Sequence, residues 1–209
     1  MTIHKNVAAD FIEQTQEPRI DKAAFVHQQG VVIGNVILGA DVFVAPFASV
    51  RGDEGGPIHI GEKSNVQDHV VIHGLETFSA GSKVEANIRT VADKEYSVYI
   101  GTEVSLAHQC QIHGPAVVMD GSFVGMQTLI FRSTVGRNCV VEPAAKLIGV
   151  EVQDNRYVPA GLVVTTQEQA DALPEIAEGY PYAGLNKAVV HVNVQLCRGY
   201  RKSFSTFSG

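Results

Sequence analysis

Aliphatic residues recur at every sixth position through most of this chain, and this period limits the possible folds more than any other feature of the sequence. The pattern breaks three times and resumes each time. Its members are Val26, Val32, Leu38, Val44, Val50, then Ile60, Val66, Ile72, then Ile100, Leu106, Ile112, Val118, Val124, and finally Val135, Val141 and Leu147. A period of six is typical of a parallel β-helix, in which three short strands form each coil and the coils stack into a triangular prism.

The fourth residue after these aliphatic positions supports the same interpretation, because it is mostly small. These residues are Gly30, Val36, Val42, Ala48, Ser64, Val70, Val104, Cys110, Ala116, Ser122, Thr128, Cys139 and Ala145. The large residue would fill the interior of the prism, and the small residue would fit near a corner. We therefore predict an all-β fold, a parallel β-helix of hexapeptide repeats with a terminal α-helix. Cys110 and Cys139 are interpreted as inert packing residues.

A long insertion interrupts the repeat. Ile60 and Ile72 correspond to Ile100 and Ile112 with an offset of 40 residues, and one coil takes only about 18. About 22 residues are thus inserted, which places a loop at residues 75–97. Long loops in compact domains are usually functional.

The repeat fades after Leu147, and the chain then changes character. Residues 165–171 have the pattern of a short capped helix that ends before Pro174. We therefore divide the chain into a β-helix domain over residues 1–165 and a helical segment over residues 166–209 that packs on it.

The tail from Leu185 onward fits two patterns. Val189, Leu196 and Tyr200 have helical spacing, whereas the valines from 190 to 194 alternate as in a strand. We favour a helix that packs along the prism, because the basic residues near its end suit a helix C-terminus.

Charge and composition exclude several classes of protein. The net charge of −6 argues against binding of nucleic acid, and no apolar run approaches the length that crosses a membrane. The first residues do not resemble a signal peptide, and the three cysteines are far apart, so we expect a reducing, cytoplasmic location. Charged residues are only 18% of the chain, against about 25% in a typical protein, which suggests that oligomerisation buries further surface.

Three of the eight histidines form a pattern. His73 and His113 follow Ile72 and Ile112, so they occupy the same outward slot of neighbouring coils, about 4.8 Å apart. His108 lies on another face, and it would meet the other two only across an interface of a threefold trimer. Three neutral imidazoles with an open fourth position are typical of a catalytic zinc site.

The residues around these histidines resemble the gamma-class carbonic anhydrases. The similar stretches are residues 51–55 (RGDEG), 64–68 (SNVQD), 73–77 (HGLET), 105–108 (SLAH), 112–115 (IHGP) and 188–194 (AVVHVNV). The resemblance extends from about Ala24 to the C-terminus, and the long insertion resembles the archetypal subgroup with a proton-shuttle loop. It implies a left-handed β-helix, a homotrimer, and reversible hydration of carbon dioxide to bicarbonate.

The resemblance also implies roles for individual residues at the metal. His73, His108 and His113 would bind it, with His108 given across the subunit interface. Gln67 would hydrogen-bond the metal-bound hydroxide, and Glu54 would sit beside it and pass or accept a proton. Three histidine ligands suit Zn²⁺, and also Fe²⁺ or Co²⁺.

Further roles concern the surroundings of the metal. The resemblance implies that Glu76 relays protons to buffer and that Asn193 orients carbon dioxide. Ionic contacts that support the trimer would come from Arg51, Asp53 and Asp68, and for Arg51 with Asp68 we expect a structural ion pair at the interface. From the residues alone two alternatives stay open: Glu76 as an ordinary solvated loop acid, and Asn193 as an amide satisfied by backbone. At the position of His191, the archetypal subgroup of the family usually has a tyrosine.

Two other functions fit the same fold. One is a non-catalytic or redox-gated scaffold domain of the carboxysome type, which would be marked by additional scaffold modules. The other is a hexapeptide acyltransferase, which needs a basic groove for nucleotide phosphates, and no cluster of basic residues suggests one. Stacked histidines favour the carbonic anhydrase.

Overall fold

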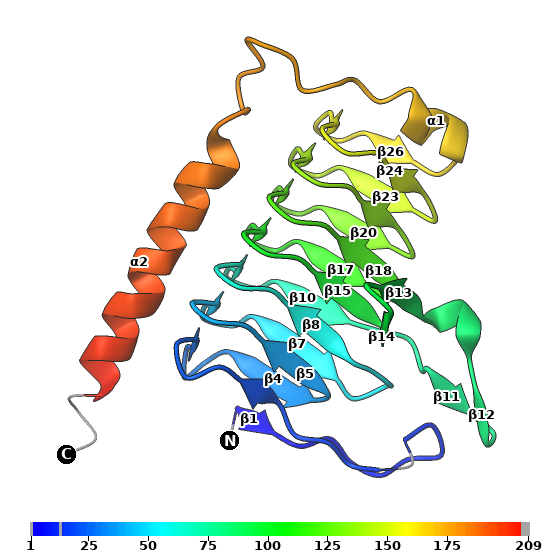
Figure 1. The fold of residues 1–209 in the computed structure, drawn as a ribbon, viewed down its shortest axis with the longest axis vertical. Helices are drawn as coiled ribbons and strands as arrows, with labels where there is room; N and C mark the ends of the chain where they lie inside the picture. The colour runs from blue at the N-terminus through cyan, green and yellow to red at the C-terminus, as the bar shows by residue number, and fades with distance from the viewer. Residues whose placement is uncertain (1, 13, 206–209) are drawn as a thin grey trace.

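Three parallel sheets form the body of the protein in the computed structural model, which describes residues 2–12 and 14–205 (Figure 1). The chain visits the three sheets in turn, so that strands of neighbouring coils stack side by side. This is the parallel β-helix expected from the repeat, in the left-handed form that the resemblance implies. The first sheet contains β1 (Ile3–His4), β4 (Val31–Gly34), β7 (Ser49–Gly52), β10 (Val71–His73), β17 (Gln111–His113), β20 (Leu129–Phe131), β23 (Lys146–Ile148) and β26 (Val163–Val164).

The other two sheets have seven strands each. The second sheet contains β2 (Arg19–Ile20), β5 (Val36–Leu38), β8 (Ile58–Ile60), β15 (Val98–Ile100), β18 (Ala116–Val118), β21 (Thr134–Val135) and β24 (Glu151–Val152). The third sheet contains β3 (Phe25–Val26), β6 (Phe43–Val44), β9 (Asn65–Val66), β16 (Ser105–Leu106), β19 (Phe123–Val124), β22 (Val140–Val141) and β25 (Tyr157–Val158).

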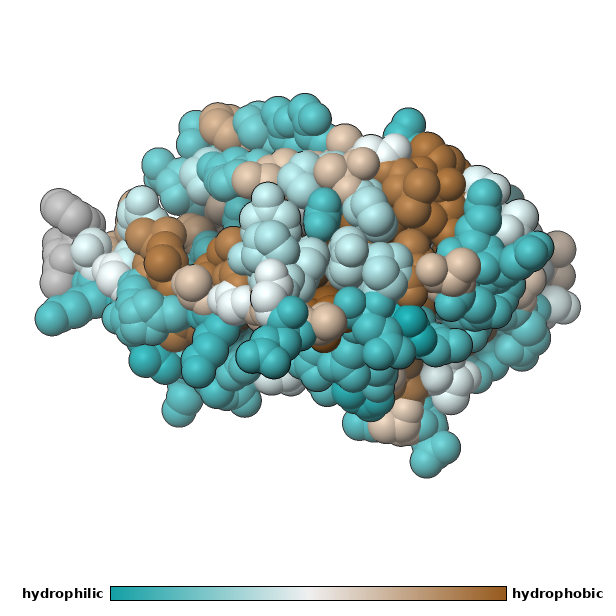
Figure 2. Space-filling model, turned by 90° about the horizontal axis from the view of Figure 1, so that it is seen from above, coloured by the Kyte–Doolittle hydropathy of each residue, from teal (hydrophilic) through white to brown (hydrophobic). Residues whose placement is uncertain are grey.

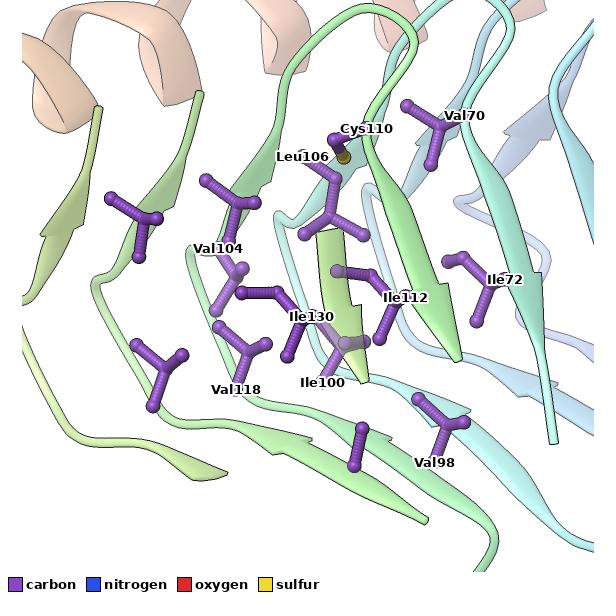
Figure 3. Close-up of a cluster of buried hydrophobic side chains, with 14 of the residues drawn as sticks. Val70, Ile72, Val98, Ile100, Val104, Leu106, Cys110, Ile112, Val118 and Ile130 are labelled. Carbon is purple, nitrogen blue, oxygen red and sulfur yellow. The ribbon is translucent and has the colours of Figure 1, made fainter. Parts of the chain in front are cut away.

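The aliphatic ladder fills the interior of the prism, as predicted. In the first sheet Val50, Ile72 and Ile112 are register partners, and all three are fully buried. Figure 3 shows Ile72, Ile112 and Ile130 pointing into the same interior, together with side chains from the other two sheets. The pairing of Ile60 with Ile100 confirms the 40-residue offset, so the insertion leaves the stacking intact.

Some of the small residues near the corners also form hydrogen bonds to the backbone. The hydroxyl of Ser64 donates to the carbonyl of Gly101 at 2.7 Å and accepts the backbone N–H of Val104 at 2.9 Å. Ser122 makes the same pair of contacts two coils further on, to Gly136 and Cys139. Buried backbone groups at a corner need partners, and a short hydroxyl side chain supplies them.

The prediction that the repeat fades after Leu147 is wrong. Val152, Val158 and Val164 form one more coil, and each is at most 3% exposed. The step from the first sheet to the second takes five residues here, from Leu147 to Val152, so the phase of a strict six-residue repeat is lost. At the other end the ladder begins earlier than Val26, with Ile20 in β2, which packs against the core.

The insertion contains two small antiparallel hairpins and a helical turn. The hairpins are β11 (Phe78–Ser79) with β12 (Ser82–Lys83), and β13 (Arg89–Val91) with β14 (Lys94–Tyr96). The 3₁₀ turn η1 (Glu85–Asn87) lies between them. The whole excursion projects from the side of the prism (Figure 1).

Two helices follow the last coil. The helix α1 (Gln167–Asp171) begins at the predicted cap, where Thr166 and Gln169 form a capping box, and its Ala170 joins the interior core at the end of the prism. The helix α2 (Leu185–Ser205) confirms the helical interpretation of the tail, and it runs back along the third sheet (Figure 1). Among the described residues, neither helix is both long and apolar enough to span a bilayer.

Side-chain contacts fix α2 on the prism. The guanidinium of Arg198 donates two hydrogen bonds to Asp41, at 3.1 and 2.7 Å, and this contact lowers the pKa of the Asp41 carboxyl. The rings of Phe25 and Phe43 stack with Tyr200, with centroids 5.6 and 5.9 Å apart. These contacts join the end of the chain to its first coils.

Truncation of one interior side chain tests the core. Ile112→Ala is expected to lower the free energy of unfolding by about 2–5 kcal/mol, because it leaves a cavity in a close-packed interior. The control is Val163→Ala in the last coil, which removes a side chain that is 47% exposed and should change stability by less than about 0.5 kcal/mol. Denaturant unfolding followed by circular dichroism measures both. Equal effects of the two variants would contradict the assigned interior.

Candidate metal centre

His73 and His113 face each other on neighbouring strands. They are register partners in β10 and β17, and their ring centroids lie 5.4 Å apart, which confirms the predicted stack. Nδ1 of His113 lies 3.2 Å from the carbonyl oxygen of Gly114. Because a carbonyl only accepts, this contact places the proton on Nδ1 and leaves the lone pair on Nε2, the form in which imidazole binds a metal.

Two carboxylates converge on His73. Its Nε2 lies 3.2 Å from Asp53 and 3.7 Å from Glu54, both in the loop that follows β7. Arg51 is the register partner of His73 on the other side, and its Nε donates to Asp53 at 3.0 Å. The strand order β7–β10–β17 therefore brings together Arg51, the two acids and two histidines.

His108 lies elsewhere, as the repeat predicts. It follows β16 of the third sheet, and its Nδ1 lies 3.0 Å from a carboxylate oxygen of Asp68. Both side chains are about half exposed, at 52% and 42%. Within one chain, the described residues contain no group of three His, Cys, Asp or Glu side chains placed to hold a metal.

A largely apolar groove separates the third sheet from α2. It has a volume of about 690 Å³, and Gln67, His108 and Asn193 contribute its polar groups together with Asp68 and Glu142. Its apolar walls include Phe43, Ala107, Phe123, Val189, Val192 and Leu196. The predicted site residues thus fall into two groups in the single chain, one beside His73 and one in this groove.

A chain of buried amides and a hydroxyl orients Gln67. Its Nε2 donates to Oδ1 of Asn65 at 2.9 Å, and Nδ2 of Asn65 donates to the hydroxyl of Ser105 at 2.9 Å. Asn65 and Ser105 are fully buried, and they are register partners in β9 and β16. Neither residue was predicted to have a role, although two polar residues at matching positions of strands 40 residues apart are the signal that would have found them.

Asn193 and Glu76 are held through local contacts. Nδ2 of Asn193 donates to the carbonyl of Val189 one helical turn earlier, at 2.9 Å, so the donor end of this amide is satisfied by backbone. The backbone oxygen of Glu76 accepts a hydrogen bond from the side chain of Asn87 at 2.8 Å. His191 is exposed on α2.

The expected ion pair between Arg51 and Asp68 does not form within the chain. Arg51 pairs with Asp53, and Asp68 pairs with His108. Arg51 belongs to the first sheet and Asp68 follows a strand of the third sheet, so a contact between them remains a prediction for neighbouring subunits.

The cysteines contribute no reactive group to this centre. Cys110, Cys139 and Cys197 are free and buried, which agrees with the interpretation of the first two as packing residues. Burial raises the pKa of all three thiols, to about 11 for Cys139 and Cys197. Thiols with a raised pKa are poor nucleophiles at neutral pH.

Curated relatives decide the family. The chain is 52% identical to a carbonic anhydrase of Methanosarcina thermophila over 202 residues, which is 96% of this chain and 82% of that protein. This chain belongs to the gamma-class carbonic anhydrase family. Within the family it also resembles the carboxysome assembly protein CcmM of Nostoc, at 47% identity over 77% of this chain, and that of Synechococcus elongatus, at 42% over 77%. The matched region spans only about a quarter of each CcmM, 27% and 28%.

Solved structures share the fold of this family member. A hexapeptide transferase family protein from Anaplasma phagocytophilum matches with a TM-score of 0.65 and 21% identity, over 88% of this chain and 93% of that chain. A putative acetyltransferase from Bacillus cereus matches with a TM-score of 0.68 and 16% identity, over 90% and 93%. At such identities the likeness shows the β-helix alone. A comparison with models of protein families finds none that matches.

Proposed function

We propose that this chain is a metal-dependent carbonic anhydrase, which hydrates carbon dioxide reversibly to bicarbonate at the interfaces of a homotrimer. The observation that carries the proposal is the pair His73 and His113, 5.4 Å apart beside Asp53 and Glu54, in a chain 52% identical to a carbonic anhydrase. His108 of a neighbouring subunit would complete a set of three imidazoles. Buried free thiols suit a reducing compartment, so we include a cytoplasmic location in the proposal.

The donor chemistry fits a divalent metal. Nδ1 of His113 is engaged by a carbonyl and Nδ1 of His108 by Asp68, which leaves Nε2 of each ring as the ligand atom. Zn²⁺, Fe²⁺ and Co²⁺ all accept imidazole. When bound, the metal supplies the Lewis acidity that makes water nucleophilic near neutral pH.

The remaining residues would handle substrate and protons. Glu54, 3.7 Å from Nε2 of His73, would take a proton released at the centre, and Glu76 would pass it on to buffer. The apolar walls of the groove suit uncharged carbon dioxide, which Asn193 would orient from α2. Gln67, fixed through Asn65, would hold the attacking oxygen by a hydrogen bond.

A carbon dioxide hydration assay on the full chain tests the proposal. The protein is loaded with zinc, with cobalt, or anaerobically with iron, and its metal content is measured beside its activity. We expect hydration with at least one metal. If the protein binds metal and forms trimers but is inactive with all three metals, the result would favour an assembly role like that named for CcmM. The 47% identity to CcmM of Nostoc supports this role as the second candidate.

Replacement of Glu76 separates proton transfer from hydration. Glu76→Ala is expected to lower kcat about tenfold or more in weak buffer, and imidazole should restore part of the loss, because a diffusible base can replace a proton relay. Glu54→Ala should be rescued less well, since Glu54 lies beside His73. Glu178→Ala, which removes an exposed acid between α1 and α2, is the control. Parent-like activity of Glu76→Ala in weak buffer would make Glu76 an ordinary loop acid.

A further inference from the structure

The loop that carries Glu54 is joined to the segment that carries Glu76. The backbone N–H of Gly56 donates to the hydroxyl oxygen of Thr77, at 3.1 Å. Gly56 lies two residues after Glu54, and Thr77 directly follows Glu76. One hydrogen bond therefore connects two stretches of chain that leave the first sheet from neighbouring strands, β7 and β10.

Close packing accompanies this hydrogen bond. A Cβ added at Gly55 would lie 2.6 Å from the backbone nitrogen of Thr77, a distance that real Cβ atoms essentially never show. Gly55 also has a φ of 142°, in the region that favours glycine. On the other side of the loop, a Cβ at Gly56 would collide with the side-chain amide of Asn35. Both glycines are thus required for the loop to approach Thr77 and Asn35 this closely.

The beginning of the same loop is held independently. Nδ2 of Asn6 donates to the carbonyl of Gly52 at 3.3 Å, and Oδ1 of Asn6 accepts the backbone N–H of Gln16 at 2.7 Å. Asn6 is only 4% exposed. The far end of the loop is held as well, because Ser97 donates to the carbonyl of Pro57 and Ile58 donates to that of Asn35. Between these two anchors, Thr77 holds the middle of the loop at Gly56.

We propose that Thr77 is a positioning residue, whose hydroxyl holds the loop bearing Glu54 against the segment bearing Glu76. The assignment rests on the proposed function, because it concerns the transfer of a proton between these two carboxylates. Without the acceptor, the N–H of Gly56 loses its partner and the distance between the two acids is no longer set. The effect is expected on proton transfer and not on the reaction with carbon dioxide.

Two measurements on the full chain test the assignment. Hydrogen–deuterium exchange followed by mass spectrometry reports the amide of Gly56 without any need for metal, and Thr77→Val should speed its exchange roughly tenfold. Steady-state hydration by the metal-loaded protein should show kcat lowered roughly tenfold in weak buffer, with kcat/KM changed less than twofold. Thr77→Ser, which keeps the acceptor, should restore both. Thr90→Val removes an exposed hydroxyl from β13 of the same insertion and should behave as the parent.

The outcomes distinguish this assignment from the proposed function. An inactive parent overturns the proposed function, and with it the link to proton transfer, while the exchange measurement still decides whether Thr77 holds the loop. An active parent with unchanged kcat in Thr77→Val overturns the positioning role, whatever the exchange shows. If Thr77→Val melts at a lower temperature than Thr90→Val, Thr77→Ala takes its place in the kinetic comparison with Thr77→Ser. Thr77→Ala removes the same acceptor with less crowding.

Discussion

Replacing His113 with alanine is expected to abolish metal binding and carbon dioxide hydration while the β-helix stays folded. Changes to residues that only orient a ligand cost about 10- to 100-fold, so loss of a ligand should lower activity by more than about 100-fold. The fold should survive because His113 points out of the prism, whereas its neighbour Ile112 is fully buried. Elemental analysis, circular dichroism and a hydration assay measure the three properties.

The matched variant for this experiment is Ile112→Ala. The two substitutions are adjacent in β17, yet they should affect different properties. Ile112→Ala should lower the free energy of unfolding, and it keeps all three histidines that would bind the metal. His113→Ala should lose metal binding and leave the free energy of unfolding unchanged. Stoichiometric metal in His113→Ala would remove His113 from the ligand set.

Mixing two inactive variants should restore activity. His108→Ala keeps His73 and His113, and His113→Ala keeps His108, so each supplies what the other lacks if a site spans two subunits. In randomly mixed trimers about one interface in four combines the two intact halves, so activity should return to roughly a quarter of the parent value. The variants are unfolded and refolded together, and light scattering confirms the trimer.

The control is the same mixture without subunit exchange, made by combining the refolded trimers. It should stay inactive. If the metal site lay within one chain, no subunit of either variant would contain all its ligands, and the refolded mixture would stay inactive as well. A parent protein that remains monomeric with metal bound would also contradict the shared site.

Much of the fold follows from the six-residue period, because an interior that admits one large side chain per strand forces that period on the chain. The offset between Ile72 and Ile112 was enough to place His73 opposite His113. The predicted β-helix domain extends to residue 165, but the repeat was not followed past Leu147, because the step to Val152 takes five residues. A repeat of fixed length cannot follow such a change of phase.

The surroundings of the candidate site were less predictable than the pairing of His73 with His113. Asn65 and Ser105 form a hydrogen bond across 40 residues, and the contact of Gly56 with Thr77 depends on how two loops fold back on each other. The second contact depends on loop paths and not on the repeat, whereas the first joins register partners and could have been predicted from the 40-residue offset. The assignment of Asn193 to the apolar side of α2 was readable from helical spacing, whereas its hydrogen bond to Val189 was one of two alternatives.

The course of α2 affects the order in which the protein is completed during synthesis. Coils of a solenoid contact mainly their neighbours, so the prism can grow as the chain emerges from the ribosome. The helix contacts β3 and β6, and Arg198 binds Asp41, 157 residues earlier. The groove that Asn193 lines is therefore assembled last, after every coil is in place. A nascent chain stalled before α2 would contain His73, His113 and His108 on a finished prism, yet it would lack one wall of this groove.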